Sequence, residues 1–250
     1  MMNKNLHFFS WKWALLFVLI LPACRRDGKK NEHTVTAPKE NRVPEGFDIH
    51  GIDVSRHNGE ISWEGVSKAV LDSNKIKFVF IKSTEGLQLK DNAFERNWHW
   101  AGKQKLYRGA YHFFRPKVHP AIQAKHYIQH NKLEKGDLPP VLDIESNGGK
   151  SDKAVAKACK KWLKIIEAHY GVKPIIYTNL QYYNKIVRGK IKGYPIWIAQ
   201  YGDCWPELDQ NDRWVFWQHN DKGRIGGIKS DVDLNVFNGD SIALRNICLQ

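Results

Sequence analysis

Cysteine is scarce in this 250-residue chain, which contains four. One lies near the N-terminus, so Cys159, Cys204 and Cys248 remain, and an odd number leaves at least one thiol unpaired in a monomer. Cys204 and Cys248 are a candidate bridge in an oxidising compartment. Cys159 falls on the apolar face of an expected helix, where we expect a buried and inert thiol.

Metal-binding spacing is also missing from the sequence. No cysteine and histidine cluster has the spacing of a zinc site. His126 and His130 lie one helical turn apart, but no carboxylate or cysteine accompanies them. We therefore expect no metal site and no cofactor.

The apolar run near the N-terminus, residues 13–21, is too short to cross a bilayer and has the layout of a signal peptide. It ends at Cys24 in a Leu-Pro-Ala-Cys sequence that resembles a bacterial lipoprotein signal, in which the cysteine becomes the lipidated first residue. An ordinary signal peptide with an incidental cysteine is the alternative. We expect a signal peptide over 1–23, a flexible linker over 24–45 and a folded barrel domain over 46–250. The protein is then exported to the cell envelope and lipid-anchored to a bacterial membrane.

Acidic residues are outnumbered in this chain, with 26 Asp and Glu against 39 Lys and Arg, a formal net charge of +13. Loss of the signal peptide leaves the chain strongly basic, which favours polyanionic surroundings such as cell-wall polymer or lipid headgroups. Nucleic acid is disfavoured, because the lysines of residues 150–164 spread over one expected helix without base-stacking aromatics. We expect a monomer.

Strand-like and helix-like segments alternate along the chain, which predicts an α/β fold with a parallel sheet. Eight strands are enough to close this sheet into a barrel. Five helices are expected between the first strands, whereas short connections rich in Gly, Asp and Asn predict that the last three strands lack covering helices and pair partly antiparallel. The expected strands span residues 47–55, 77–83, 107–114, 140–146, 174–178, 195–200, 213–219 and 232–237, and the expected helices span 63–73, 91–103, 119–131, 151–170 and 180–187.

Two acids alternate with apolar residues in the fourth expected strand, Val-Leu-Asp-Ile-Glu over residues 141–145. Alternation in a strand places Asp143 and Glu145 on one face, about 7 Å apart between Cα atoms, with Leu142 and Ile144 on the other. Like charges this close raise the proton affinity of one carboxyl group. A protonated acid beside an ionised one is the pair commonly used to cleave glycosidic bonds, so we expect a glycoside hydrolase.

Further polar residues are expected at the same rim, because the carboxyl ends of barrel strands form the active-site face. Asp53 ends the first strand, Glu85 ends the second and Asp233 lies on the last. Flat side chains that could stack on sugar rings accompany them. Besides Glu85, the expected substrate-binding residues are Tyr111, Phe113, Tyr177, Trp197, Tyr201 and Gln218. Trp217 also lies near a strand end, and Gln218 and His112 are weaker candidates than the aromatic residues.

Four motifs in order resemble family 25 glycoside hydrolases, the peptidoglycan-cutting lysozymes of bacteria and phages. They are the segments 53–63 (Asp-Val-Ser-Arg-His-Asn-Gly through Ile-Ser-Trp), 78–86 (Phe-Val-Phe-Ile-Lys-Ser-Thr-Glu-Gly), 109–113 (Gly-Ala-Tyr-His-Phe) and 143–145 (Asp-Ile-Glu). Trp-Ile-Ala at 197–199 and Trp-Gln at 217–218 follow. The resemblance spans most of residues 48–237 and implies a modified TIM-like barrel of five β/α units followed by three strands.

The resemblance also implies the reaction, hydrolysis of the β-1,4 bond between N-acetylmuramic acid and N-acetylglucosamine in peptidoglycan glycan strands. Glu145 would protonate the leaving oxygen. Asp143 would either steer the 2-acetamido group of the substrate or stabilise the positive charge at the anomeric carbon, and Asp53 and Asp233 would tune this pair.

Two other functions compete with this interpretation. A chitinase-like or endo-N-acetylglucosaminidase barrel also carries an Asp and a Glu two residues apart, but a further Asp is expected where Val141 stands. A catalytically inactive glycan-binding lipoprotein would keep the barrel without turnover. Retention of both Asp143 and Glu145 argues against it.

Overall fold

The computed structural model describes residues 41–71, 73–202 and 204–250. The expected signal peptide, Cys24 and the linker as far as residue 40 lie outside the described residues. Within the described ranges, no helix combines the length and apolar character needed to span a membrane.

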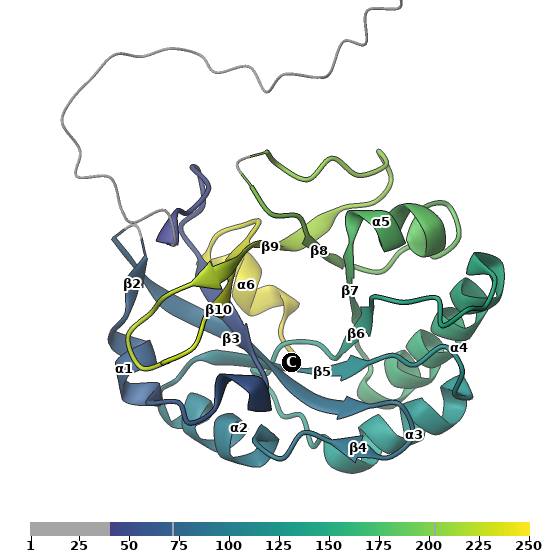
Figure 1. Ribbon diagram of the computed structural model, residues 1–250, viewed down its shortest axis with the longest axis horizontal. Coiled ribbons are helices and arrows are strands. Elements are labelled where there is room, and N and C mark those ends of the chain that lie inside the picture. Colours follow the sequence, from purple (N-terminus) through teal and green to yellow (C-terminus); the bar gives the residue numbers. More distant parts are fainter. Residues whose placement is uncertain (1–40, 72, 203) are drawn as a thin grey trace, which may run out of the picture. The chain divides into compact units, whose positions relative to one another are not determined.

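Eight strands form a closed barrel, as the sequence predicts (Figure 1). Closure occurs at β1, which pairs in parallel with β3 and antiparallel with β10. The pairing is parallel from β1 through β3 to β9 and becomes antiparallel only between β9 and β10 and between β10 and β1. The barrel strands are β1 (His50–Val54), β3 (Asn74–Glu85), β5 (Tyr107–Phe113), β6 (Val141–Ile144), β7 (Ile175–Asn179), β8 (Ile196–Ala199), β9 (Trp214–Gly223) and β10 (Val232–Phe237).

The five expected helices are present, and Figure 1 shows α2, α3 and α4 along the outside of the strands. The first helix is shorter than expected, because a hairpin of β2 (Val70–Leu71) with the start of β3 occupies the end of its predicted range. A second short strand, β4 (Leu89–Lys90), pairs with the end of β3. The helices are α1 (Trp63–Lys68), α2 (Phe94–Lys103), α3 (Pro120–His130), α4 (Asp152–Tyr170) and α5 (Leu180–Tyr182), the last continuing as a π-helical turn, η3 (Tyr183–Val187).

Alternation along the strands sorts apolar side chains into two layers. Leu142 and Ile144 of β6 face outward and belong to the cluster beneath the helices, which also contains Cys159, buried as predicted. Phe80 of β3 faces inward and stacks on Trp197 with ring centroids 4.3 Å apart. The barrel interior is therefore a packed core below the rim that carries the acids.

A helix that the sequence analysis does not predict, α6 (Ser241–Ile247), closes the end of the barrel opposite the acidic rim. Its Leu244 is buried with residues from the starts of several barrel strands, among them Phe78. Cys248 directly after it is a free, buried thiol whose Sγ donates to the Leu244 carbonyl at 3.2 Å. The candidate bridge between Cys204 and Cys248 is therefore wrong, because packing of α6 directs Cys248 inward.

Truncation of a buried side chain of α6 tests the contribution of this helix to stability. Leu244→Ala leaves a cavity in the inner core and should lower the free energy of unfolding by about 2–5 kcal/mol. Ile242→Ala on the exposed side of the same helix, where Ile242 is 65 % exposed, should change it by less than about 0.5 kcal/mol. Urea unfolding measures both values, and equal effects would contradict a closing role for α6.

Candidate active site

A cavity of about 220 Å³ opens at the carboxyl ends of the parallel strands. Every strand of the closed barrel, or the loop that follows it, contributes at least one lining side chain. The lining residues are Asp53, Ser55, His57, Lys82, Tyr111, Phe113, Asp143, Glu145, Tyr177, Trp197, Tyr201, Gln218 and Asp233.

Asp143 and Glu145 both point into this cavity, because successive side chains of β6 alternate between the two faces of the strand. Asp143 is only 4 % exposed, whereas Glu145, directly after the strand, is exposed. No described group forms a hydrogen bond with Asp143 Oδ1. This oxygen is therefore available to a ligand that carries a hydrogen-bond donor.

Burial raises the pKa of both carboxyl groups of this pair. The pKa of Asp143 is raised well above its usual value, first by burial and then by the charge of Glu145. Glu145 is more exposed than Asp143, but partial burial of its carboxyl group also raises its pKa, and the charge of Lys82 opposes this. Two negative charges in one buried site are costly, which favours a proton shared between Asp143 and Glu145.

Asp53 and Asp233 form a second carboxyl pair, because they are directly opposite each other in the ladder between β1 and β10. Burial raises the pKa of Asp53 to about 6, against hydrogen bonds from Asn235 and Gln218. Burial and the neighbouring Asp53 charge raise the pKa of Asp233 to about 9. Asp233 is therefore the protonated partner and donates to Asp53.

Each hydrogen bond in the network around Asp53 is donated toward the Asp53 carboxylate. Asn235 Nδ2 and Gln218 Nε2 each donate to Asp53 Oδ1 at 2.8 Å. Trp197 Nε1 donates to Asn235 Oδ1 at 2.8 Å, and the Tyr177 and Tyr201 hydroxyls donate to Gln218 Oε1 at 2.8 and 3.0 Å. Donors from four strands and one loop thus converge on Asp53, which favours its ionised form.

Every residue predicted to be catalytic lines the cavity, and so does every predicted substrate-binding residue except Glu85. Glu85 instead forms ion pairs with Lys82 and Arg115. Of the other two candidates, Trp217 packs outside the barrel and His112 is buried beneath the helices, hydrogen-bonded to Thr84 and Gln123.

The predicted site residues do not include three of the lining residues, which are Ser55, His57 and Lys82. Lys82 continues the inward alternation of Phe78 and Phe80 along β3, so the strand period contains the signal that places it in the cavity. His57 lies in the short helix η2 (Arg56–Asn58) after β1, which has no periodic signal of its own.

Comparison with known proteins finds a family model and curated relatives that match most of this chain. The model of glycosyl hydrolases family 25 matches residues 52–228. The Escherichia coli K12 protein YegX is 43% identical over 198 residues, covering 79% of this chain and 72% of YegX. Lysozyme M1 of Streptomyces globisporus is 33% identical, covering 78% of this chain and 70% of that protein.

Solved structures resemble the fold closely. A family 25 glycosyl hydrolase from Bacillus anthracis has a TM-score of 0.75 at 30% identity, covering 84% of this chain and 98% of that one. A bacterial lysozyme from Streptomyces coelicolor has a TM-score of 0.73 at 31% identity, covering 82% of this chain and 98% of that one.

Replacement of the protonated acid tests the second carboxyl pair. Because the pKa of Asp233 is raised from 3.8 to about 9 on folding, the folded chain binds the extra proton and stability falls as pH rises between those values. Asp233→Asn keeps an N–H donor toward Asp53 but cannot ionise. Its stability should therefore decline less than that of the wild type between about pH 5 and about pH 9.

Urea unfolding across this pH range measures the effect. The matched control is Asp231→Asn, because Asp231 lies nearby but is paired with Arg224 at the surface. A decline in Asp233→Asn as steep as in the wild type would show that Asp233 is not the protonated partner.

Proposed function

Because the chain belongs to glycosyl hydrolase family 25, we propose that it is a peptidoglycan hydrolase that cleaves the β-1,4 bond between N-acetylmuramic acid and N-acetylglucosamine. The observation that carries this proposal is the pair Asp143 and Glu145 in a cavity at the barrel rim. The lysozymes among the relatives of this chain support it.

Glu145 is the proton donor to the leaving oxygen in this proposal, because it is the more exposed acid of the pair. Asp143 Oδ1 has no described partner and suits the N–H of a 2-acetamido group on the substrate. Such a donor favours ionised Asp143 and leaves the retained proton on Glu145. Asp143 then either steers the acetamido group or stabilises the positive charge at the anomeric carbon.

Asp53 and Asp233 are positioning residues in this mechanism. They hold one negative charge and one proton beside the first pair, and the Asp53 charge raises the pKa of Asp143. The five donors leading to Asp53 keep this arrangement rigid while a sugar binds.

The aromatic lining divides into a floor and a rim. Trp197 is 1 % exposed and its indole N–H is bonded to Asn235, so it supports the floor. Tyr201 is 53 % exposed and suits stacking on a sugar ring at the rim. Tyr111 and Phe113 are half-buried and contribute the facing wall.

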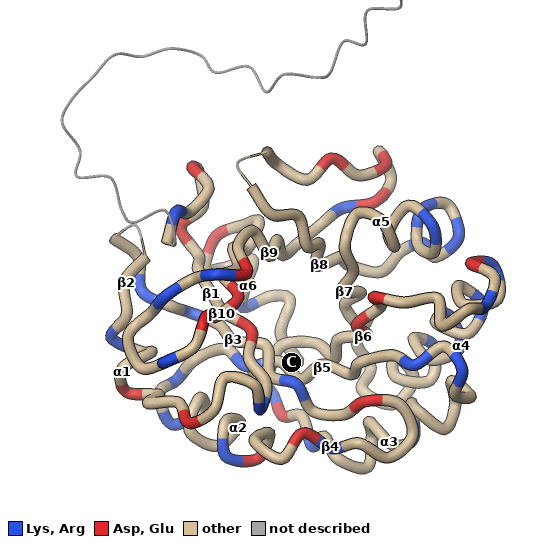
Figure 2. Tube along the Cα trace, in the orientation of Figure 1, with Lys and Arg blue, Asp and Glu red and all other residues tan. Residues whose placement is uncertain are grey.

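We also propose that the protein is a monomeric envelope lipoprotein anchored through Cys24. The expected linker from Cys24 gives the barrel reach from a membrane toward glycan strands. Its last residues belong to the barrel domain instead, because Asn41 is hydrogen-bonded to Arg224 and Val43 packs against the core. Blue segments along α4 in Figure 2 mark basic residues, and this positive charge favours polyanionic surroundings. Lys153, Lys157, Lys160 and Lys190 line a hollow there.

Cys24→Ser should move the protein from the membrane to the soluble fraction, and an unchanged distribution would contradict the anchor.

Digestion of purified peptidoglycan tests the function, read by mass analysis of the products. We expect muropeptides with muramic acid at the reducing end. Products ending in N-acetylglucosamine would favour the chitinase-like or endo-N-acetylglucosaminidase alternative, and no release would favour an inactive glycan-binding lipoprotein.

Replacement of the proposed acid tests its role in the same assay. Glu145→Gln keeps the shape of the side chain but cannot donate the proton, so the rate should fall by about 10²–10⁴-fold with the fold retained. Glu64→Gln on the exposed face of α1 is the control and should keep the wild-type rate. Wild-type turnover in Glu145→Gln would remove Glu145 from this role.

A further inference from the structure

Lys82 brings a fixed positive charge to a cavity otherwise dominated by carboxyl groups. It is the lysine among the described lining residues, which include no arginine. Its side chain is only 14 % exposed, and it follows Phe78 and Phe80 on the inward face of β3. A cation this buried requires a partner that holds it in place.

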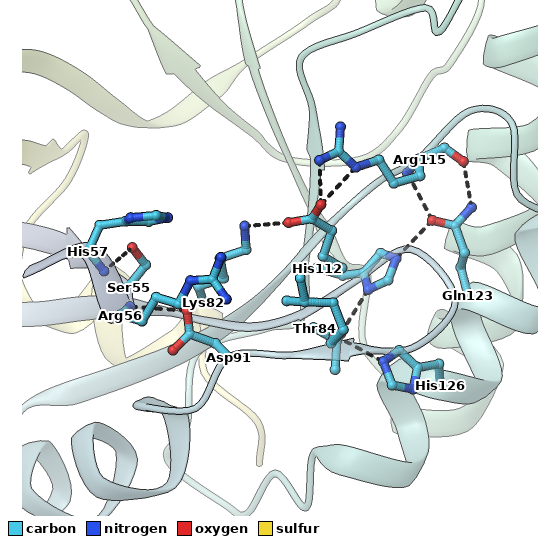
Figure 3. A network of polar contacts seen from close by, with 12 residues as sticks. Ser55, Arg56, His57, Lys82, Thr84, Asp91, His112, Arg115, Gln123 and His126 are labelled. Atoms are coloured by element: carbon cyan, nitrogen blue, oxygen red, sulfur yellow. Dashed lines mark hydrogen bonds and ion pairs between the residues drawn. The ribbon is translucent and has the colours of Figure 1, made fainter.

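Glu85 and Arg115 supply that support (Figure 3). Lys82 Nζ donates to Glu85 Oε2 at 2.7 Å, and Arg115 Nε donates to Glu85 Oε1 at 2.8 Å. The Phe113 ring contacts both cations, 4.8 Å from Lys82 Nζ and 4.6 Å from the Arg115 guanidinium carbon. Each oxygen of Glu85 thus binds one cation, and the aromatic ring packs against both.

The backbone of Arg115 is in turn fixed by a buried side chain of α3. Gln123 Oε1 accepts from the Arg115 N–H at 2.9 Å, and Gln123 Nε2 donates to the Arg115 carbonyl at 3.0 Å. Gln123 is fully buried and also contacts His112 Nε2 at 3.1 Å. Figure 3 shows these contacts running from α3 through Arg115 toward Lys82.

Charged and titratable groups approach Asp143 and Glu145 from every side of the cavity. The ones on the described elements are Asp53 of β1, His57 of η2, Lys82 and Glu85 of β3, Tyr111 of β5, Tyr177 of β7, Tyr201 after β8 and Asp233 of β10, with Arg115 behind Glu85. Among them, the charge of Lys82 lowers the pKa of both Asp143 and Glu145.

We propose that Lys82 is a positioning residue for hydrolysis, held at the cavity wall by Glu85 and Arg115, and that its charge sets the pH range in which Asp143 and Glu145 share one proton. This role rests on the proposed function, since it acts through the two proposed catalytic acids. Lys82 Nζ uses one of its three N–H groups in the described hydrogen bonds, and its side chain lines the cavity.

The pH dependence of kcat/KM on peptidoglycan tests this role. In Lys82→Met both acids hold their protons more tightly, so both limbs of the bell-shaped profile should move to higher pH, by about one unit. On the acid limb of the wild-type profile, kcat/KM should therefore fall by up to about tenfold, which is the change that a shift of one pH unit produces there. Lys82→Arg keeps the charge and should restore most of the wild-type profile.

Two further variants separate charge from structural support. Arg115→Gln leaves the Glu85 charge less compensated and should shift the profile in the same direction by a smaller amount, at an exposed position that tolerates substitution. Lys90→Met removes an exposed ion pair with Glu95 on the neighbouring β4 and should leave the profile unchanged. If Lys82→Met fails to fold, the Arg115→Gln profile decides the question.

A uniform loss of rate in Lys82→Met with both limbs unmoved would overturn the proposal, and so would a wild-type profile. Carbon-13 NMR titration of the carboxyl carbons of wild type and Lys82→Met reads the charge effect without turnover. Unchanged titration of Asp143 and Glu145 there would also overturn it. A wild type that releases no muropeptides, with the titration shift intact, would instead contradict the proposed function.

Discussion

Closure of the barrel at β1 is the constraint on which the site depends. Pairing of β1 with both β3 and β10 places Asp53 directly opposite Asp233 and turns both toward the acids of β6. Without closure these carboxyl groups would lie at separate sheet edges in contact with water. Within the closed rim they are desolvated together, and desolvation is the largest cause of the raised pKa at each of the four.

Desolvation alone would leave four protonated acids, and two features of the structure oppose this. Hydrogen-bond donors converge on Asp53 and hold it as an acceptor, while Asp233 keeps the proton between them. At the other pair, the charge of Lys82 lowers the pKa that burial raises, and Glu85 and Arg115 hold Lys82 in place. The cavity therefore contains acids in different states that are set by their neighbours, which is the arrangement acid-catalysed glycoside hydrolysis uses.

The strand period predicts much of this from sequence, because alternation fixes which face each residue occupies once the strands are located. It places Asp143 and Glu145 correctly and locates all eight barrel strands, including the antiparallel end. The period cannot show which charges pair, so Glu85 is expected in the cavity where Lys82 lies instead. It also misses α6, a seven-residue helix whose sequence signal is limited to the capping Asp240.

The four carboxyl groups of the cavity share protons in a defined pattern, which neutron diffraction from deuterated crystals near neutral pH can observe. We expect a deuteron on Asp233 directed at Asp53, none on Asp53, and one deuteron within the pair Asp143 and Glu145. Four carboxylates without deuterons, or a deuteron on Asp53 with Asp233 bare, would contradict it.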